Sequence, residues 1–169
     1  MSAQVTLNRP AMSYTTHPLA SNRNDDTIGT RVWIDEYAFL QSLYQSAENC
    51  SPKFRLPDLI SACVSLVFNE PEPARHIFNY LHTEMILRDP DSLRRQEEMW
   101  MPQYRLLLDL QRSPANRHPH PQFKLDHFTT ACITLVSRGQ GTTLRIFEQA
   151  RRNTAERGAQ RCHTEPLTQ

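Results

Sequence analysis

The arginine, lysine and histidine side chains are the residues of this sequence whose types point to chemistry, and their spacing fits binding better than catalysis. No Gly-rich phosphate loop, Gly-x-Ser-x-Gly, His-Glu-x-x-His or Cys-x-x-Cys motif occurs, so the spacings typical of phosphate, nucleophile and zinc sites are missing. His118 and His120 alternate with prolines. A metal there would need ligands that the sequence does not place nearby, so we interpret this stretch as a solvated loop. We expect no enzyme activity, no catalytic residue, no metal and no cofactor.

The basic residues are the candidates for binding a polyanion. The formal net charge is +1, so a nucleic-acid partner would have to be recognised by a local patch. Arg31 lies in a short extended segment, and Arg55 and Lys124 occupy equivalent places before two similar helices. A further basic run lies toward the C-terminus and consists of Arg145, Arg151, Arg152, Arg157 and Arg161.

An internal repeat positions these residues. Residues 33–44 align with residues 100–111 at an offset of 67, and residues 54–68 align with residues 123–137 at an offset of 69. The identical pairs are Trp33/Trp100, Tyr37/Tyr104, Leu40/Leu107, Leu43/Leu110, Phe54/Phe123, Leu56/Leu125, Ala62/Ala131, Cys63/Cys132, Leu66/Leu135 and Val67/Val136. Two amphipathic helices can look alike by chance, but here polar positions match as well.

The apolar periodicity predicts the same elements in each copy. A short extended piece (30–34, and about 98–101) precedes a first helix, a Pro-rich loop and a second helix (57–68, and 126–136). A third helix begins near Pro73 and near Thr142. One copy has too small a core to fold alone. We therefore expect a mainly α fold in which the copies, 30–88 and 89–155, pack as a pseudo-twofold dimer, with disordered tails at 1–29 and 156–169.

The order of strand, helix, loop and helix resembles the ribbon-helix-helix DNA-binding unit, as does the stretch Asp58-Leu59-Ile60-Ser61-Ala62 at the start of a second helix. Two units in one chain resemble the tandem ribbon-helix-helix accessory proteins of conjugative plasmids. This resemblance implies a DNA-binding accessory or transcription-regulating protein, with double-stranded DNA and the other proteins of a nucleoprotein complex as partners. The paired strands would enter the major groove.

The same resemblance implies roles for individual residues. Arg31 and Trp33 would face outward and contact DNA. Glu98 and Trp100 would face outward as well, and Glu97 and Glu98 would repel phosphates. The side chains that would face the helices are Val32, Ile34, Met99 and Met101. The second helix of each unit would anchor a phosphate at its N-terminus, where Arg55 and Lys124 stand. If the chain binds DNA, the C-terminal basic run would add phosphate contacts through Arg145, Arg151, Arg152, Arg157 and Arg161.

Alternative interpretations remain open at this point. Residues 91–100 contain good helix formers and favour helix at least as well as strand. Paired Trp residues are more often core than groove readers. The near-neutral charge and the Glu97-Glu98 pair favour an all-helical protein-interaction module that binds no nucleic acid.

The cysteines and the chain ends favour a cytoplasmic protein with no membrane partner. Cys63 and Cys132 fall in apolar periodic segments, where a free thiol behaves as a small hydrophobe, and this fits a reducing compartment. The N-terminal stretch lacks the pattern of a secretory signal, and no run of about 18 apolar residues occurs.

Overall fold

The computed structural model describes residues 26–117 and 122–164, which form a mainly helical fold with one small antiparallel sheet. The α-helices and strands occur in this order: β1 (Thr27–Trp33), α1 (Ile34–Gln45), α2 (Leu56–Phe68), α3 (Pro73–Thr83), β2 (Arg94–Trp100), α4 (Met101–Arg112), α5 (Leu125–Ser137) and α6 (Thr142–Thr164). Two short 3-10 helices, Met85–Leu87 and Pro114–Asn116, follow α3 and α4. His118 and His120 lie outside the described residues, as do residues 1–25 and 165–169.

Strands β1 and β2 pair in antiparallel register and form a two-stranded ribbon. Thr27 lies opposite Trp100, Arg31 opposite Gln96, and Trp33 opposite Arg94. Residues 94–100 are therefore strand, although their helix-forming residues also allow a helix. Pairing along the full length of β1 satisfies the backbone of this polar segment. The expectation that the two extended segments exist is confirmed, and each strand is longer than the segment predicted for it. The placement of Ile34 and Met101 in the strands is wrong, because they are the first residues of α1 and α4.

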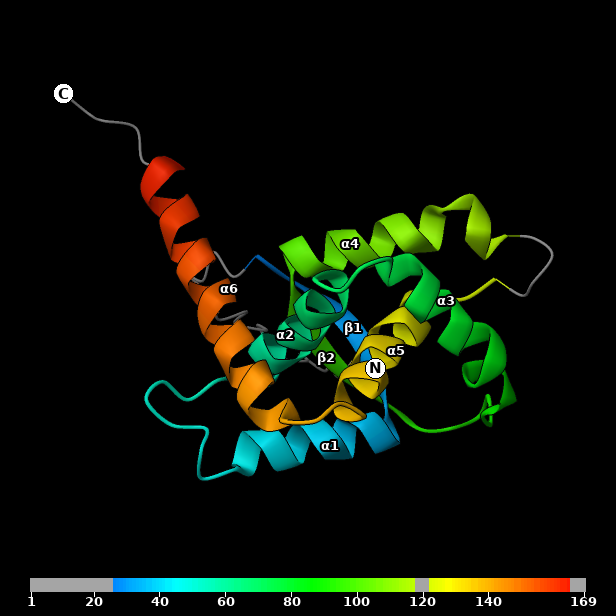
Figure 1. Ribbon diagram of the computed structural model, residues 1–169, viewed down its shortest axis with the longest axis horizontal. Coiled ribbons are helices and arrows are strands. Elements are labelled where there is room, and N and C mark those ends of the chain that lie inside the picture. Colours follow the sequence, from blue (N-terminus) through cyan, green and yellow to red (C-terminus); the bar gives the residue numbers. More distant parts are fainter. Residues whose placement is uncertain (1–25, 118–121, 165–169) are drawn as a thin grey trace, which may run out of the picture.

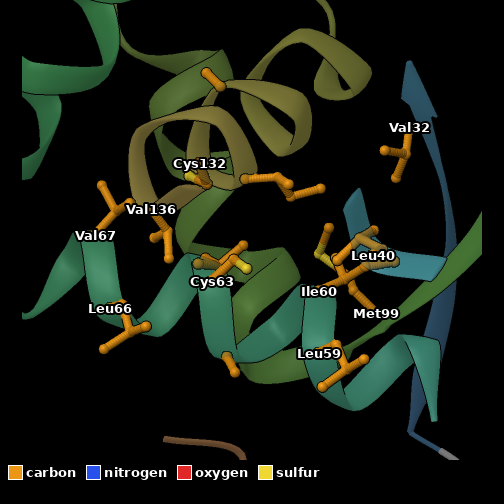
Figure 2. Packing of buried hydrophobic residues seen from close by; sticks show 14 of the residues in the cluster. Val32, Leu40, Leu59, Ile60, Cys63, Leu66, Val67, Met99, Cys132 and Val136 are labelled. Carbon is orange, nitrogen blue, oxygen red and sulfur yellow. The ribbon is translucent and has the colours of Figure 1, made fainter. Parts of the chain in front are cut away.

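Helices α2 and α5 form the centre of the core, because most of the residues of each are buried. Cys63 and Cys132 are fully buried there and are free thiols. Figure 2 shows Cys63 on α2 and Cys132 on the neighbouring helix, with Val32 of β1 and Met99 of β2 on the same core. Burial raises the pKa of the Cys63 thiol to about 12 and also raises that of Cys132. The prediction that both thiols act as core residues is confirmed.

The outer elements pack across the molecule rather than onto their own half. Strand β1 and helix α3 pack on α5, whereas strand β2 and helix α6 pack on α2. Figure 1 shows α1 and α4 on opposite sides of the central α2–α5 pair, with α6 and α3 on the two remaining sides and the ribbon behind. Each strand and each third helix therefore completes the core around the second helix of the other half.

Backbone hydrogen bonds tie the ribbon to the central helices. The N–H of Trp33 donates to Oγ1 of Thr130 on α5 at 3.3 Å, and the N–H of Trp100 donates to Oγ of Ser61 on α2 at 2.9 Å. These hydroxyls give partners to the amide at the end of each strand, which would otherwise be buried without one. They fix the ribbon on the face formed by α2 and α5.

An asparagine holds the loop before each central helix. The Asn49 side chain accepts the N–H of Phe54 at 2.7 Å and donates to the carbonyl of the same residue at 3.0 Å. Asn116 makes the same two bonds with Phe123, both at 2.9 Å. These buried bonds position the basic residue that follows each phenylalanine.

Two sequence-based boundaries are wrong. Residues 156–164, predicted to be part of a disordered tail, are the C-terminal turns of α6, because Arg157 gives this polar stretch a partner on the body of the protein. The first strand begins at Thr27 rather than at residue 30, and residues 1–25 of the predicted N-terminal tail, like residues 165–169, lie outside the described residues. No helix in the described part of the chain combines the length and the hydropathy needed to cross a bilayer.

Candidate nucleic-acid interface

The outer face of the ribbon exposes a small set of polar side chains. Gly29 and Arg31 of β1 and Gln96 and Glu98 of β2 are exposed there, in the register that pairs Gly29 with Glu98 and Arg31 with Gln96. A Cβ added to Gly29 would lie 3.0 Å from Nε2 of Gln96, so the glycine leaves room for that amide. Thr27 donates to Glu98 at 3.2 Å. This face offers donors and acceptors side by side.

Trp33 and Trp100 occupy the ends of the same face but are covered. Trp33 is 1% exposed, and the guanidinium groups of Arg88 and Arg94 lie 4.7 and 4.5 Å from its ring centroid. Its side chain is on the predicted face, but the prediction that it contacts a partner is wrong, because these two groups and the His127 ring, 5.8 Å away, cover it. The guanidinium of Arg157 covers Trp100 at 3.8 Å. The interpretation of both tryptophans as core residues is confirmed.

A groove of about 1000 Å³ opens where the ribbon meets the start of α5. Arg31 and Lys124 both line it, and Lys124 directly precedes α5. The remaining lining residues are Gly29, Thr30, Pro90, Arg94, Gln96, Gln111, Gln122, Phe123, Leu125, Asp126 and His127. The structure thus brings two of the predicted site residues together in a groove rich in amide and cationic side chains.

His127 caps the start of α5 in this groove. Its Nδ1 accepts the backbone N–H of Lys124 at 2.9 Å, which requires the unprotonated nitrogen. Burial lowers the pKa of His127, Asp126 opposes this effect, and Arg94 and Lys124 reinforce it. Asp126 itself forms an ion pair with Arg94 at 2.7 Å. The helix end therefore carries a neutral cap, and the carboxylate beside it already has a partner.

The start of α2 is built differently, around a carboxylate. Asp58 accepts the N–H of Arg55 at 2.9 Å, Nε1 of Trp100 at 2.7 Å and a guanidinium N–H of Arg157 at 3.2 Å. Arg55 directly precedes α2, and its side chain is 46% exposed. Both basic residues predicted at the second-helix starts are thus in the predicted places, and Asp58 links strand, helix and α6.

Arg151 and Arg152 lie on α6 and point to different parts of the molecule. The guanidinium of Arg151 lies 5.9 Å from the Phe54 ring, near the start of α2. Arg152 lines a small cavity with Asn69 and Glu70, past the far end of α2. The structure therefore places Arg151, but not Arg152, on the side of α2 that carries Arg55.

A buried ion pair supports the Trp33 end of the ribbon. Arg88 donates to both carboxylate oxygens of Glu36, at 2.7 and 3.0 Å, and Thr134 donates to the same carboxylate at 2.7 Å. The hydrogen bonds that Arg88 donates to Glu36 raise the pKa of the arginine. In the other half, Gln103 donates to Ser65 at 3.1 Å, so an amide stands where the first half has a carboxylate.

Sequence reasoning missed several residues that shape this interface. Arg94 and Gln96 were hidden in a segment with ambiguous secondary structure. The three-residue spacing from Arg55 to Asp58 is a capping signal that could have identified the carboxylate. Among the described residues, no group of three or more His, Cys, Asp or Glu side chains is arranged to hold a metal ion.

No family model matches the chain, and neither the curated proteins nor the solved structures yield a match.

Proposed function

We propose that this chain is a DNA-binding accessory or regulatory protein of the plasmid or mobile-element type, which inserts the β1–β2 ribbon into the major groove of double-stranded DNA. The observation that carries the proposal is the antiparallel pairing of β1 with β2, whose outer face is exposed. A two-stranded ribbon has the width that the major groove admits. The exposed face supplies polar groups that no large side chain covers, and it consists of Gly29, Arg31, Gln96 and Glu98.

We also infer that the fold is an internally duplicated unit packed about a pseudo-twofold axis. Several pairs of contacts support this. The backbone N–H groups of Trp33 and Trp100 both donate to a hydroxyl at equivalent positions. The side chains of Asn49 and Asn116 make the same loop hydrogen bonds. The elements of β1–α1–α2 also have the same lengths as those of β2–α4–α5. The exchange of strands and third helices across the core is the packing expected of a dimer fused into one chain.

The ribbon face has the chemistry for direct base readout. Arg31 can donate to O6 and N7 of guanine, Gln96 can pair with N6 and N7 of adenine, and Glu98 can accept from N4 of cytosine. Arg31 makes no ion pair among the described residues. Arg31 and Gln96 form one cross-strand pair, and Glu98 lies in the next pair along the same face, so the three side chains can reach neighbouring base pairs.

The helix starts beside the ribbon supply the contacts that carry no sequence information. Arg55 and Lys124 stand at the N-termini of α2 and α5, where the positive end of the helix dipole also favours an anion. Each such cation adds a phosphate contact that strengthens binding to any sequence and is weakened by salt. Base contacts and phosphate contacts therefore come from different residues and can be tested separately.

The test uses fluorescence anisotropy with labelled 24-base-pair duplexes, between 25 and 200 mM KCl. A site is first selected from a random-sequence pool with the unaltered chain. Arg31→Ala should lose about 1–3 kcal/mol of discrimination at one position of that site with little change in salt dependence. Arg55→Ala combined with Lys124→Ala should weaken all sequences alike and reduce the salt slope by about 2. Arg75→Ala on α3, whose side chain is 77% exposed, serves as the control.

Two results would count against the proposal. Selection that enriches no sequence would remove the major-groove role of the ribbon. If Arg55→Ala with Lys124→Ala leaves the affinity and the salt slope unchanged, the helix starts do not contact phosphates.

A protein-interaction role is the second candidate, and one observation favours it. Leu87 and Leu93 are 82% and 70% exposed, and both lie in the connection between α3 and β2. Such side chains can serve a protein partner. The all-helical form of this alternative is wrong, because β1 and β2 are paired strands.

A further inference from the structure

The last turns of α6 are folded although they contribute nothing to the apolar core. Residues 153–164 contain no apolar side chain larger than alanine or cysteine, and Gly158 in their middle disfavours helix by about 1 kcal/mol relative to alanine. Figure 1 shows that the C-terminal part of α6 extends beyond the rest of the body. Core burial therefore does not explain why the helix continues this far.

Polar contacts to the ribbon end hold this extension in place. Arg157 lies 3.8 Å from the Trp100 ring centroid and donates to Asp58 at 3.2 Å. Asn153, one turn earlier, donates to Ser65 of α2 at 3.1 Å. Because Trp100 is the last residue of β2 and Asp58 caps α2, these contacts align α6 with the edge of the candidate interface.

One stripe of the extension faces a cationic cleft. Thr154, Arg157, Gly158 and Arg161 recur at helical spacing, so they lie on one face of α6. Together with residues beside α2 they line a cavity of about 390 Å³ whose other walls are Pro52, Lys53, Phe54, Arg55, Asp58 and Trp100. Four of the lining side chains are cationic and one is a carboxylate, so the cleft has a positive balance. A Cβ at Gly158 would meet no atom within 4 Å, which leaves the cleft open.

In the described part of the chain, the other end of the ribbon has no such helix. Helix α3, which packs on α5, ends at Thr83, and Trp33 is covered instead by Arg88, from the connection between α3 and β2, and by Arg94, the first residue of β2. The two ends of the interface therefore differ: one has an open groove, and the other has an added helical wall that carries Arg157 and Arg161.

We propose that the cleft between the α6 extension and the start of α2 is a second phosphate-contacting site, which extends the contact with duplex DNA beyond the ribbon on the Trp100 side only. Lys53, Arg55 and Arg161 face the DNA backbone there. Arg157 is a positioning residue, because it docks the extension on Trp100. This inference rests on the proposed function and deepens it, since it assigns a contact with the phosphate backbone of the DNA that the ribbon alone does not reach.

The experiment measures anisotropy with a fluorescein-labelled 24-base-pair duplex of mixed sequence between 25 and 200 mM KCl. Lys53→Ala with Arg161→Ala should lower the salt slope by about 1.8 and weaken binding about tenfold at 50 mM KCl. Arg75→Ala with Arg105→Ala removes the same charge from exposed positions on α3 and α4, and it should change the slope much less. Lys53→Arg with Arg161→Lys should keep the unaltered slope.

A second pair of variants replaces Gly158 and leaves every cationic side chain of the cleft in place. Gly158→Glu places a carboxylate in the cleft where the backbone has room, and Gly158→Gln places a neutral side chain of the same size there. Both favour helix over glycine, so neither should unfold α6. Gly158→Glu should weaken duplex binding severalfold, and Gly158→Gln should leave the salt slope unchanged.

The possible failures are distinguishable. If the unaltered chain shows no salt-sensitive binding to the duplex, the proposed function and this inference both fall. If it binds, but Lys53→Ala with Arg161→Ala matches the control pair and Gly158→Glu matches Gly158→Gln, the ribbon proposal stands and the cleft is not a phosphate site.

Discussion

Replacing Glu36 by glutamine tests whether the buried ion pair supports the Trp33 end of the ribbon. Glu36 is 8% exposed and accepts three hydrogen bonds, two from Arg88 and one from Thr134. Gln103 stands at the aligned position of the other half, so glutamine fits this backbone environment. Glu36→Gln therefore gives the first half the amide that Gln103 supplies in the other half, while Arg88 keeps its charge.

The expected cost follows from the loss of a partner for Arg88. Removing one member of a buried pair typically costs about 3–5 kcal/mol, because the other charge stays buried without compensation. Asp35 lies 3.6 Å from Arg88 and is largely exposed, so it compensates part of this loss. We therefore expect Glu36→Gln to lower the free energy of unfolding by about 3 kcal/mol.

Urea unfolding at pH 7, followed by circular dichroism, measures this change. The double variant Glu36→Gln with Arg88→Met removes both charges and should recover at least half of the loss, as replaced buried pairs often do. A loss below about 1 kcal/mol for Glu36→Gln, or a double variant no more stable than the single one, would refute this account of the ion pair.

Three further predictions concern other buried groups. Trp100→Phe should lower the free energy of unfolding by about 1–3 kcal/mol, because it deletes the hydrogen bond to Asp58. Trp33→Phe should lower it less, since Nε1 of Trp33 has no hydrogen-bond partner in the described structure. Equal losses of stability in urea unfolding would contradict this. Burial lowers the pKa of His127 in the folded chain, so as the pH falls the imidazole is protonated in the unfolded chain first. The contribution of His127 to stability should therefore be complete above about pH 6.5 and decrease as the pH drops below that value. His127→Asn should flatten this part of the pH profile, and an unchanged profile would reject the assignment. Ellman's reagent at pH 8 should label the exposed Cys50 and Cys162 in the native chain and reach Cys63 and Cys132 only on unfolding, so rapid labelling of all four would show that the core opens.

The central helices were predictable because their apolar runs are strong and bounded by turn residues. The predicted second helices, 57–68 and 126–136, differ from α2 and α5 by at most one residue at each end. The equivalent asparagines, Asn49 and Asn116, lie at the offset of 67 already used for the first helices. Extending the alignment by a few residues would have identified them as loop anchors.

The strand β2 and the end of α6 were harder to predict because tertiary contacts override local preference there. Residues 94–100 are polar and form a strand because β1 offers a complete set of backbone partners. Residues 153–164 are also polar, and they stay helical because Arg157 reaches Trp100. Neither partner is close in sequence, so a window of local propensity cannot include it.

The orientation of Trp33 shows a different limit. Strand alternation places its side chain on the outer face with Arg31, and this follows from the period of two. Alternation says nothing of what covers that face, and here Arg88 comes from a connection more than 50 residues later in the chain. Candidate site residues can therefore be assigned to a face from sequence, but their exposure depends on distant segments.

The most direct test of the central claim is a ¹H–¹⁵N NMR titration of the chain with its selected duplex DNA. The proposed function predicts the largest shift changes at the amides of Gly29–Arg31 and Gln96–Glu98, with smaller ones at the starts of α2 and α5. Shift changes confined to the connection around Leu87 and Leu93, or none at the ribbon at saturating DNA, would contradict it.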